Sequence, residues 1–285
     1  MKMGWLSGSE QNGTLLDRER AIFELIMPFG SERRVAATGM VINGRTLKMQ
    51  KLMMQALSLG MGLALAGAVW AEAPKEWNTV GGEQDEAMLL TPDLENGLDV
   101  YEVCAACHLT EGWGTKEGTF PQLAGQHRNV LIKQLADIRA LNRDNPTMYP
   151  FALPESIGDA QALADVTAYI ETLPMNPENG VGPGDKLEQG KKLYDDNCVK
   201  CHGESGRGDP EKFYPRIEGQ HYKYMLRQFE WIRDGKRRNA NPDMVKQIEG
   251  FSDDDMIAVI DYVSRLKPPK EDLAPSKDWL NPDFD

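Results

Sequence analysis

Two short segments of the chain each place two cysteines and a histidine within five residues. They are CAACH at residues 104–108 and CVKCH at residues 198–202. A cysteine pair at this spacing can form half of a zinc site, act as a redox-active dithiol, or carry a covalently attached cofactor. These three kinds of chemistry predict three different proteins, so the residues between and around the two segments must decide among them.

Zinc and dithiol chemistry both fit the surrounding sequence poorly. Two cysteine pairs that share one zinc ion are usually separated by roughly 15–20 residues, whereas 90 residues separate Cys107 from Cys198. A thioredoxin-like dithiol needs a strand–helix–strand context, and the alternating pattern typical of strands is absent from the sequence. A structural disulfide within either segment would leave the adjacent histidine without a role.

The pattern C-x-x-C-H is the attachment signature of c-type haem. Two thiols add to the two vinyl groups of the haem as thioethers, and the histidine that follows is thereby carried under the iron as its proximal ligand. The sequence therefore predicts two covalently bound haem c groups in one chain. The predicted attachment residues are Cys104, Cys107, Cys198 and Cys201, and the predicted proximal ligands are His108 and His202.

A methionine in each half of the chain is the predicted sixth ligand of the iron. Met148 is the only methionine between His108 and the last predicted helix of the first half, and Met244 occupies the matching Asn-Pro-x-Met position of the second half. These methionines follow the two proximal histidines by 40 and 42 residues, which leaves room for a loop and a helix around the haem. His127 and His221, each preceded by Gly-Gln, are the alternative ligands; otherwise they are surface or helix-cap residues.

The chain repeats itself, and the repeat puts these residues in equivalent positions. An offset of 94 residues relates Pro121 to Pro215, and the Gly-Gln-His tripeptide at 125–127 to the one at 219–221. Matching order and spacing over many positions predict two copies of one domain, joined by a segment rich in Pro and Gly. The predicted bounds are 95–174 for the first domain, 175–184 for the linker and 185–267 for the second domain.

Within each copy the apolar residues recur at helical spacing. The predicted helices are Asn129–Leu141 and Asp159–Leu173 in the first domain, and Tyr222–Arg233 and Asp253–Leu266 in the second. Ser252 is the predicted N-cap of the last of them. A domain of this size buries too little apolar surface to be stable alone. The predicted fold class is therefore all-α, with each small domain wrapped around one covalently attached haem.

On these residues the chain resembles the class I cytochromes c, and specifically the two-domain dihaem cytochromes c4 of bacterial periplasms. The shared features are the paired C-x-x-C-H motifs, the hexapeptides PQLAGQ from Pro121 and PRIEGQ from Pro215, a following helix and then a methionine. The resemblance implies that the carbonyl groups of Pro121 and Pro215 bind the proximal histidines, which fixes each imidazole and raises its basicity.

The resemblance also implies how the helices of each domain meet. In this family a Gly-x-x-x-aromatic motif on the first helix crosses the last helix at an aromatic residue. We therefore expect one close helix crossing in each domain. The residues at these positions are Gly97, Tyr101 and Tyr169 in the first domain, and Gly190, Tyr194 and Tyr262 in the second.

The first 71 residues are expected to be absent from the mature protein. They are interpreted as an N-terminal extension upstream of the true start, followed by a signal peptide. The apolar run from Leu52 to Trp70 follows basic residues and ends in small residues of the kind that a signal peptidase recognises. Cleavage after Ala71 would deliver the chain to the periplasm. The alternative is an uncleaved membrane anchor, since the 19 residues of this run could span a bilayer.

Two further segments exceed the usual domains of the family. Residues 72–94 form an N-terminal extension, and residues 268–285 form a Pro-rich acidic tail that contains one tryptophan. The tail is expected to be an extended segment on the surface, with a docking peptide as the alternative.

The balance of charge constrains the partners of the chain. The sequence has 44 Asp and Glu against 32 Lys and Arg, and residues 72–285 alone carry a formal charge of −15. Nucleic-acid binding is not expected, because it needs a basic surface to neutralise phosphates. Redox partners with a basic docking surface are expected instead.

A haem iron with histidine and methionine in its two axial positions suits outer-sphere electron transfer. The predicted function is a periplasmic electron carrier between a donor and a terminal oxidase or reductase. The alternative is the electron-accepting subunit of a larger dehydrogenase, for example one that oxidises sulfide or an alcohol, in loose or stable association with a membrane complex. An enzyme in its own right is not expected, because haem attachment uses all four cysteines and each domain offers a methionine ligand.

Overall fold

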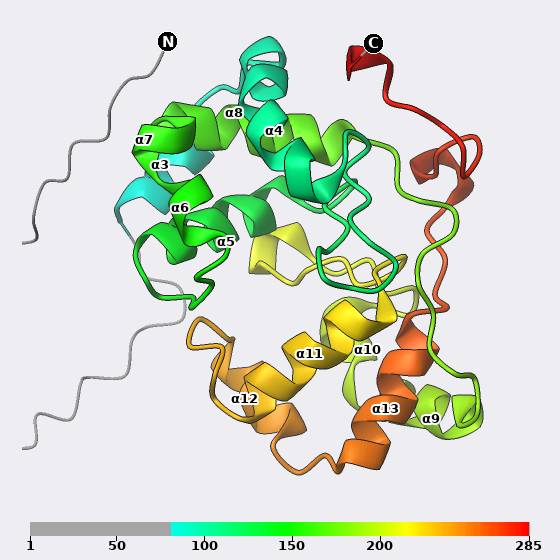
Figure 1. Cartoon of the computed structure of the whole chain (residues 1–285). Helices are drawn as coiled ribbons and strands as arrows, with labels where there is room; N and C mark the ends of the chain where they lie inside the picture. The colour runs from blue at the N-terminus through cyan, green and yellow to red at the C-terminus, as the bar shows by residue number, and fades with distance from the viewer. Residues whose placement is uncertain (1–80, 285) are drawn as a thin grey trace, which may run out of the picture. The chain divides into compact units, whose positions relative to one another are not determined.

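The computed structural model describes residues 81–284, and their regular structure is helical (Figure 1). Strands are absent from this range, which has only two isolated backbone bridges, Met175 with Leu273 and Asp209 with Tyr214. The predicted all-α fold class is therefore confirmed. No helix within residues 81–284 is long and apolar enough to cross a membrane. The predicted signal segment lies outside the described residues.

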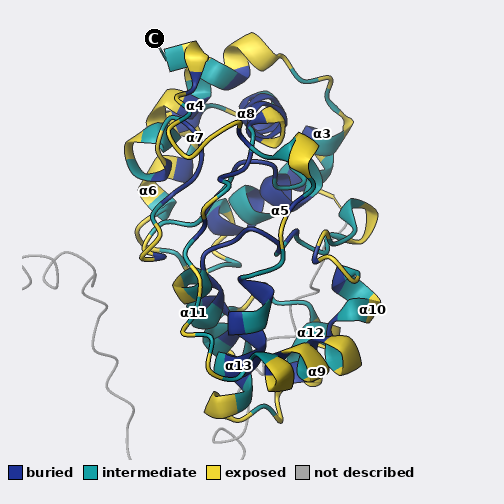
Figure 2. Ribbon diagram, turned by 90° about the vertical axis from the view of Figure 1, so that its right-hand side faces the viewer, coloured by how far each residue is buried: buried dark blue, intermediate teal, exposed yellow. Residues whose placement is uncertain are grey.

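The helix α8 is the most buried element of the first half of the described chain. Every residue from Ala162 to Ile170 is buried, and Figure 2 shows this helix enclosed by its neighbours. The helices of this half are α3 (Glu83–Leu89), α4 (Leu94–His108), α5 (Arg128–Arg139), α6 (Tyr149–Ala152), α7 (Pro154–Ile157) and α8 (Ala160–Thr172).

Two helices, α11 and α13, supply most of the apolar core of the second half. Met225 and Phe229 of α11 pack in one buried cluster with Val259 and Val263 of α13. The elements of this half are α9 (Leu187–Asn197), α10 (Val199–His202), η1 (Pro210–Lys212), α11 (Tyr222–Arg233), α12 (Pro242–Ile248), α13 (Asp253–Val263), η2 (Lys270–Asp272) and η3 (Pro282–Phe284).

All four predicted helices are present, and α11 has the predicted bounds. The helix α5 begins one residue before the prediction, at Arg128, and ends two residues before it, at Arg139. Ser252 caps α13 as predicted: its hydroxyl accepts from the backbone N–H of Asp255, whose carboxylate accepts in turn from the N–H of Ser252. This capping box satisfies two backbone donors at once and fixes where the helix starts.

A glycine lets the first long helix of each domain cross the last one closely. A Cβ added at Gly97 of α4 would lie 2.5 Å from the backbone oxygen of Asp165 in α8. A Cβ at Gly190 of α9 would lie 2.8 Å from the carbonyl carbon of Ala258 in α13. Both crossings expected from the resemblance are thus confirmed, and an aromatic pair packs beside each. The ring centroids lie 5.5 Å apart for Tyr101 with Tyr169 and 5.6 Å apart for Tyr194 with Tyr262.

The described part of the N-terminal extension packs on the first domain. The helix α3 contacts α5 and α8. Arg139 of α5 forms an ion pair with Glu83, and the guanidinium of Arg128 donates to the carbonyl oxygen of Ala87 at 2.9 Å. The extension therefore stabilises the outer face of the first domain.

The segment predicted as a linker is fixed between the two domains. Met175 is buried, and the backbone N–H of Asn176 donates to the side-chain oxygen of Gln122 at 2.8 Å. The Asn179 side-chain amide donates to the backbone carbonyls of Gln220 and Ser264, both at 2.8 Å. Residues 175–184 therefore hold the domains together rather than merely connecting them.

The C-terminal tail returns to the first domain instead of ending on the second (Figure 1). The backbone N–H of Ala274 donates to the carbonyl of Met175 at 2.9 Å. Further along, the Asn281 side-chain amide donates to the carbonyl of Thr110 at 2.8 Å and to the hydroxyl of Tyr169 at 2.9 Å. Asn281 is only 2% exposed, so this part of the tail is buried, whereas the prediction was an extended segment on the surface.

Two aromatic residues of the tail complete this contact. Trp279 lies against Trp113 at a centroid distance of 5.9 Å, and Phe284 packs nearly perpendicular to Tyr101 at a centroid distance of 6.1 Å. Tyr101 and Trp113 both belong to the buried core of the first domain. Trp279 and Phe284 thus extend the core of the first domain, although the second domain is nearer to them in the sequence.

Candidate haem-binding sites

Both C-x-x-C-H segments lie where a helix ends. Residues 104–108 form the last part of α4, and residues 198–202 span the junction of α9 with the single-turn helix α10. None of the four cysteines forms a disulfide; Cys198 is buried and the other three are half-buried. Helical geometry brings positions three residues apart to one face, so the two thiols of each pair can reach the same group.

The histidine of each segment is held by a proline carbonyl 13 residues further on. His108 Nδ1 lies 2.9 Å from the carbonyl oxygen of Pro121, and His202 Nδ1 lies 3.2 Å from that of Pro215. Because a carbonyl only accepts, each Nδ1 carries the proton and each Nε2 keeps the lone pair that a metal needs. Burial lowers the pKa of both histidines, and the bond to the proline offsets this only in part. Both rings are therefore neutral, and neither Nε2 has a hydrogen-bond partner within residues 81–284.

A glycine in each domain makes room for the loop that carries the proline. Gly114 has φ 63°, and a Cβ there would lie 2.6 Å from the carbonyl carbon of Pro121. Gly208 has φ 75°, and a Cβ there would lie 2.6 Å from the carbonyl oxygen of Pro215. The positive φ and the close approach both require glycine. Sequence reasoning missed these two residues, although they too are 94 positions apart.

The two candidate methionines lie on the segment between the middle helix and the last helix of each domain. Met148 is the N-cap residue of α6, and its backbone N–H donates to the side-chain oxygen of Asn145 at 3.3 Å. Met244 lies inside α12 and packs against the buried cluster of the second domain. Both side chains are half-buried. Their local structures differ, although their sequence positions match.

The alternative ligands, His127 and His221, lie at the interface between the domains. His221 is fully buried: its Nδ1 accepts from the backbone N–H of Gly180 at 3.0 Å, and its Nε2 donates to the carbonyl of Trp113 at 2.7 Å. The surface alternative is therefore wrong for His221, because the second domain buries it against the first, whereas the helix-cap alternative holds: His127 is the N-cap residue of α5 and His221 that of α11. His127 Nε2 likewise bonds to the carbonyl of Arg207 at 2.7 Å. With these bonds in place, neither histidine presents a free Nε2 to a metal.

A cluster of cationic side chains also lies between the domains, and sequence reasoning missed it. Arg143 and Arg237 are 94 positions apart, and each donates to the side-chain oxygen of Gln228, at 3.3 and 3.0 Å. Lys133, which is buried, bonds to Asp137 at 2.8 Å within the same cluster. Burial, and next the positive charge of Arg143, lower the pKa of Arg237 to about 9.

These features together fit covalently attached haem. The cysteine pairs are unbridged, each adjacent histidine offers a neutral Nε2, and the cationic cluster suits the carboxylate side chains that every haem carries. The cysteines and histidines that the sequence predicts thus lie together in each domain, and each histidine is bonded to the predicted proline carbonyl.

Comparison with known proteins agrees with this assignment. Residues 94–174 and 187–267 each match the cytochrome c family, so the fold and the sites define a tandem of two cytochrome c domains that carry two covalent haem c groups. The cytochrome c4 of Azotobacter vinelandii is 32% identical over 191 residues, which cover 61% of this chain and 89% of that protein. The chain belongs to the cytochrome c4 family. It is a dihaem electron carrier rather than an enzyme, as the sequence predicts.

Two further similarities extend this result. The crystal structure of reduced recombinant cytochrome c4 from Pseudomonas stutzeri superimposes with a TM-score of 0.54 at 29% identity, over 62% of this chain and 100% of that one. A protein of Stutzerimonas stutzeri (strain A1501) named thiosulfate dehydrogenase electron acceptor is 33% identical over 173 residues, which cover 57% of this chain and 78% of that protein.

Proposed function

We propose that the chain is a periplasmic carrier that passes electrons between a donor and a terminal oxidase or reductase. The observation that carries the proposal is the duplicated histidine arrangement. In each domain a buried histidine has Nδ1 bonded to a proline carbonyl and Nε2 without a partner within residues 81–284. Haem, when bound, supplies a one-electron couple at each of these two positions.

Each chemical role in this proposal belongs to a matched pair of residues. The proline carbonyls would orient the imidazoles and raise their basicity, and the methionines would supply the second protein ligand of each iron. With two protein ligands the iron would have no open position for a substrate, and the bound haem would supply outer-sphere electron transfer. The proposed roles are thioether attachment for Cys104, Cys107, Cys198 and Cys201, axial ligation for His108, Met148, His202 and Met244, and support of the histidines for Pro121 and Pro215.

Alanine variants of the two methionines test the ligation. Met148→Ala should let carbon monoxide bind to one reduced haem of each chain, and Met244→Ala to the other, whereas the wild-type protein should bind it poorly. Met225→Ala removes a buried methionine of α11 and is the matched control, which should leave carbon monoxide binding unchanged. Unchanged binding in Met148→Ala and Met244→Ala would place the sixth ligand elsewhere.

The haem content tests the attachment. Cys198→Ala combined with Cys201→Ala should halve the covalent haem per chain, measured as haem absorbance per unit of protein and as haem staining on a denaturing gel. A wild-type protein with one haem, or with zinc, would contradict the proposal.

The proposed location depends on the N-terminal segment, which lies outside the described residues. We place cleavage after Ala71, the mature chain at 72–285, and the two domains at 95–174 and 185–267. N-terminal sequencing of the protein from the periplasmic fraction tests this placement. An uncleaved chain in the membrane fraction would favour the anchor.

A second candidate function is the electron-accepting subunit of a larger dehydrogenase. The relative named thiosulfate dehydrogenase electron acceptor favours it, because a protein with that name receives electrons from a dehydrogenase. Purification from the native periplasm separates the two candidates. A carrier should elute alone, and a subunit should elute with a larger protein that contains the catalytic site.

A further inference from the structure

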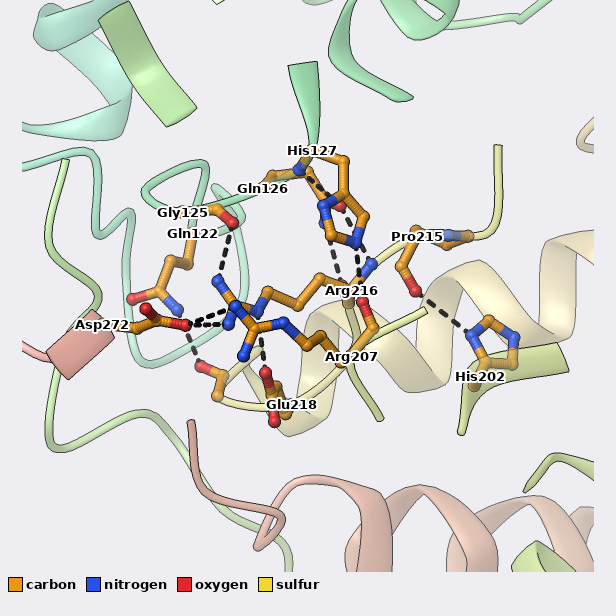
Figure 3. Close-up of polar contacts among 11 residues, drawn as sticks. Gln122, Gly125, Gln126, His127, His202, Arg207, Pro215, Arg216, Glu218 and Asp272 are labelled. Atoms are coloured by element: carbon orange, nitrogen blue, oxygen red, sulfur yellow. Dashed lines mark hydrogen bonds and ion pairs between the residues drawn. The ribbon is translucent and has the colours of Figure 1, made fainter. Parts of the chain in front are cut away.

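The two domains exchange a matched pair of glutamine contacts. The side chain of Gln126, in the first domain, accepts from the backbone N–H of Arg216 at 2.9 Å and donates to the carbonyl of Arg216 at 2.8 Å (Figure 3). The side chain of Gln220, in the second domain, accepts from the backbone N–H of Gln122 at 3.0 Å and donates to its carbonyl at 2.8 Å. Each glutamine therefore binds one residue of the other domain through both of its backbone groups.

The bound residue is in both cases the one that follows the proline of the histidine site. The N–H of Gln122 belongs to the same peptide group as the carbonyl of Pro121, which holds His108. The N–H of Arg216 belongs to the same peptide group as the carbonyl of Pro215, which holds His202 (Figure 3). One planar peptide group thus joins a proximal histidine on one side to a glutamine of the opposite domain on the other.

The repeat explains why the contacts are reciprocal. Gln122 corresponds to Arg216, and Gln126 to Gln220, at the offset of 94 that relates the two domains. Equivalent surfaces therefore face each other across the interface, as they do in a twofold dimer. The histidines that follow the two glutamines continue the pattern, because both bond to carbonyls of the opposite domain at 2.7 Å.

A hydrogen bond to a peptide N–H makes the carbonyl of the same group a stronger acceptor, because successive hydrogen bonds polarise one another. A stronger acceptor at Nδ1–H makes the imidazole a more basic ligand through Nε2. A more basic ligand favours the oxidised metal and lowers its reduction potential. The arrangement therefore connects each proximal histidine electronically to a side chain of the opposite domain.

We propose that Gln126 and Gln220 are positioning residues that act across the domain interface. Each sets the orientation and basicity of the proximal histidine of the other domain, so the reduction potential of each haem depends on the docking of the partner domain. This inference rests on the proposed function of His108 and His202 as iron ligands. It assigns the Gly-Gln-His tripeptides a role in electron transfer that is distinct from ligation.

The test compares Gln126→Leu with a matched interface variant in the full-length holoprotein. Gln126→Leu removes both bonds to Arg216 without adding charge. Arg238→Gln removes a different contact between the domains, with the carbonyl of Leu141 and with Asp144, and leaves both proline peptides untouched. The readouts are the two reduction potentials from a spectroscopic titration, and the hyperfine-shifted Nδ1–H signals of the oxidised protein labelled with ¹⁵N-histidine.

Gln126→Leu should raise the potential of the second-domain haem and move the signal of His202, while the signal of His108 stays in place. The signals are distinguished by contacts with Phe120, whose ring centroid lies 6.0 Å from that of His108. We expect the ratio of reduced to oxidised second-domain haem to rise about threefold at a fixed potential, which is about 28 mV for one electron. Arg238→Gln should leave both signals and both potentials unchanged.

A conservative variant and the mirror-image variant complete the test. Gln126→Glu keeps an acceptor for the N–H of Arg216 and should return the His202 signal to the wild-type position or move it beyond. Gln220→Leu should affect His108 and the first-domain haem instead, and it replaces Gln126→Leu if that variant does not fold. Equal effects on both haems, an effect confined to the domain that carries the substitution, or no effect at all would overturn the inference. A wild-type protein without two hyperfine-shifted histidines would contradict the proposed function instead.

Discussion

At the scale of single residues, Gly114 shows how a position without a side chain can control a ligand. Its φ of 63° and the approach of the Pro121 carbonyl leave no room for a Cβ. The same loop brings the N–H of Gly114 to the carbonyl of His108 at 2.9 Å. A change at Gly114 therefore displaces the group that orients the proximal histidine.

Gly114→Ala should lower the free energy of unfolding of the holoprotein by roughly 3 kcal/mol or more, and should perturb the first haem. Gly235→Ala is the matched control, because Gly235 has φ 69° and no atom within 4 Å of an added Cβ. That control carries only the left-handed backbone strain of roughly 1–2 kcal/mol. Denaturant unfolding of both variants measures the difference, and equal losses would show that the loop tolerates a side chain.

His221 gives the stability of the molecule a defined dependence on pH. Burial lowers the pKa of His221, and its Nδ1 must be unprotonated to accept from Gly180. Below the ordinary histidine pKa of about 6.5 the unfolded chain therefore binds a proton that the folded chain excludes. The free energy of unfolding should fall as the pH drops below about 6.5, by up to about 1.4 kcal/mol per pH unit.

Denaturant unfolding from pH 7 to pH 5 measures this slope. His221→Gln should make the slope shallower by the contribution of this one group, since glutamine does not titrate. A slope that is unchanged in His221→Gln would assign the titration to other groups.

At the scale of elements, helix bounds and caps can be predicted from the sequence because they depend on residues close together in the chain. Contacts between the two domains cannot, because they form only when the domains pack together. The helix α11 has its predicted bounds because its apolar residues repeat at helical spacing, and Ser252 caps α13 because a cap and its partner lie three residues apart. The C-x-x-C-H segments are equally local, so their chemistry is visible in the sequence.

The remaining features arise only when two distant surfaces meet. The burial of His221, the cluster around Arg143 and Arg237, and the bonds of Gln126 to Arg216 all join one domain to the other. Nothing in a segment considered alone distinguishes such a residue from one on the surface. The offset of 94 was nevertheless a usable signal, because it pairs Arg143 with Arg237 in the sequence.

The tail provides a prediction at the scale of an element. Trp279→Ala should lower the free energy of unfolding of the first domain by about 1–2 kcal/mol, because the half-buried indole packs against Trp113. Its neighbour Leu280 is 70% exposed, so Leu280→Ala should change the stability by less than about 0.5 kcal/mol. Thermal unfolding monitored at each haem measures both variants, and similar effects would show that the indole contributes no more than an exposed side chain.

At the scale of the whole molecule, charge governs encounters with partners. Residues 72–285 carry a formal charge of −15, and opposite potentials accelerate diffusional association. The second-order rate of electron transfer to a basic redox protein should fall steeply with salt, since the Debye length shrinks from about 30 Å at 0.01 M to about 10 Å at 0.1 M. Stopped-flow mixing across a salt series measures this rate. A complex that survives high salt on gel filtration would favour the permanent subunit.

Residues 279–284 pack on the first domain, so the core of that domain can be fully covered only after the second domain has been synthesised. In terms of connectivity the second domain is an insertion, because both ends of the described chain pack on the first. A ribosome releases the residues of a chain from the N-terminus onward, so Tyr101 and Trp113 remain uncovered until residues 279–284 have been synthesised. A chain that stops before residue 279 would therefore be damaged in the domain that was synthesised first.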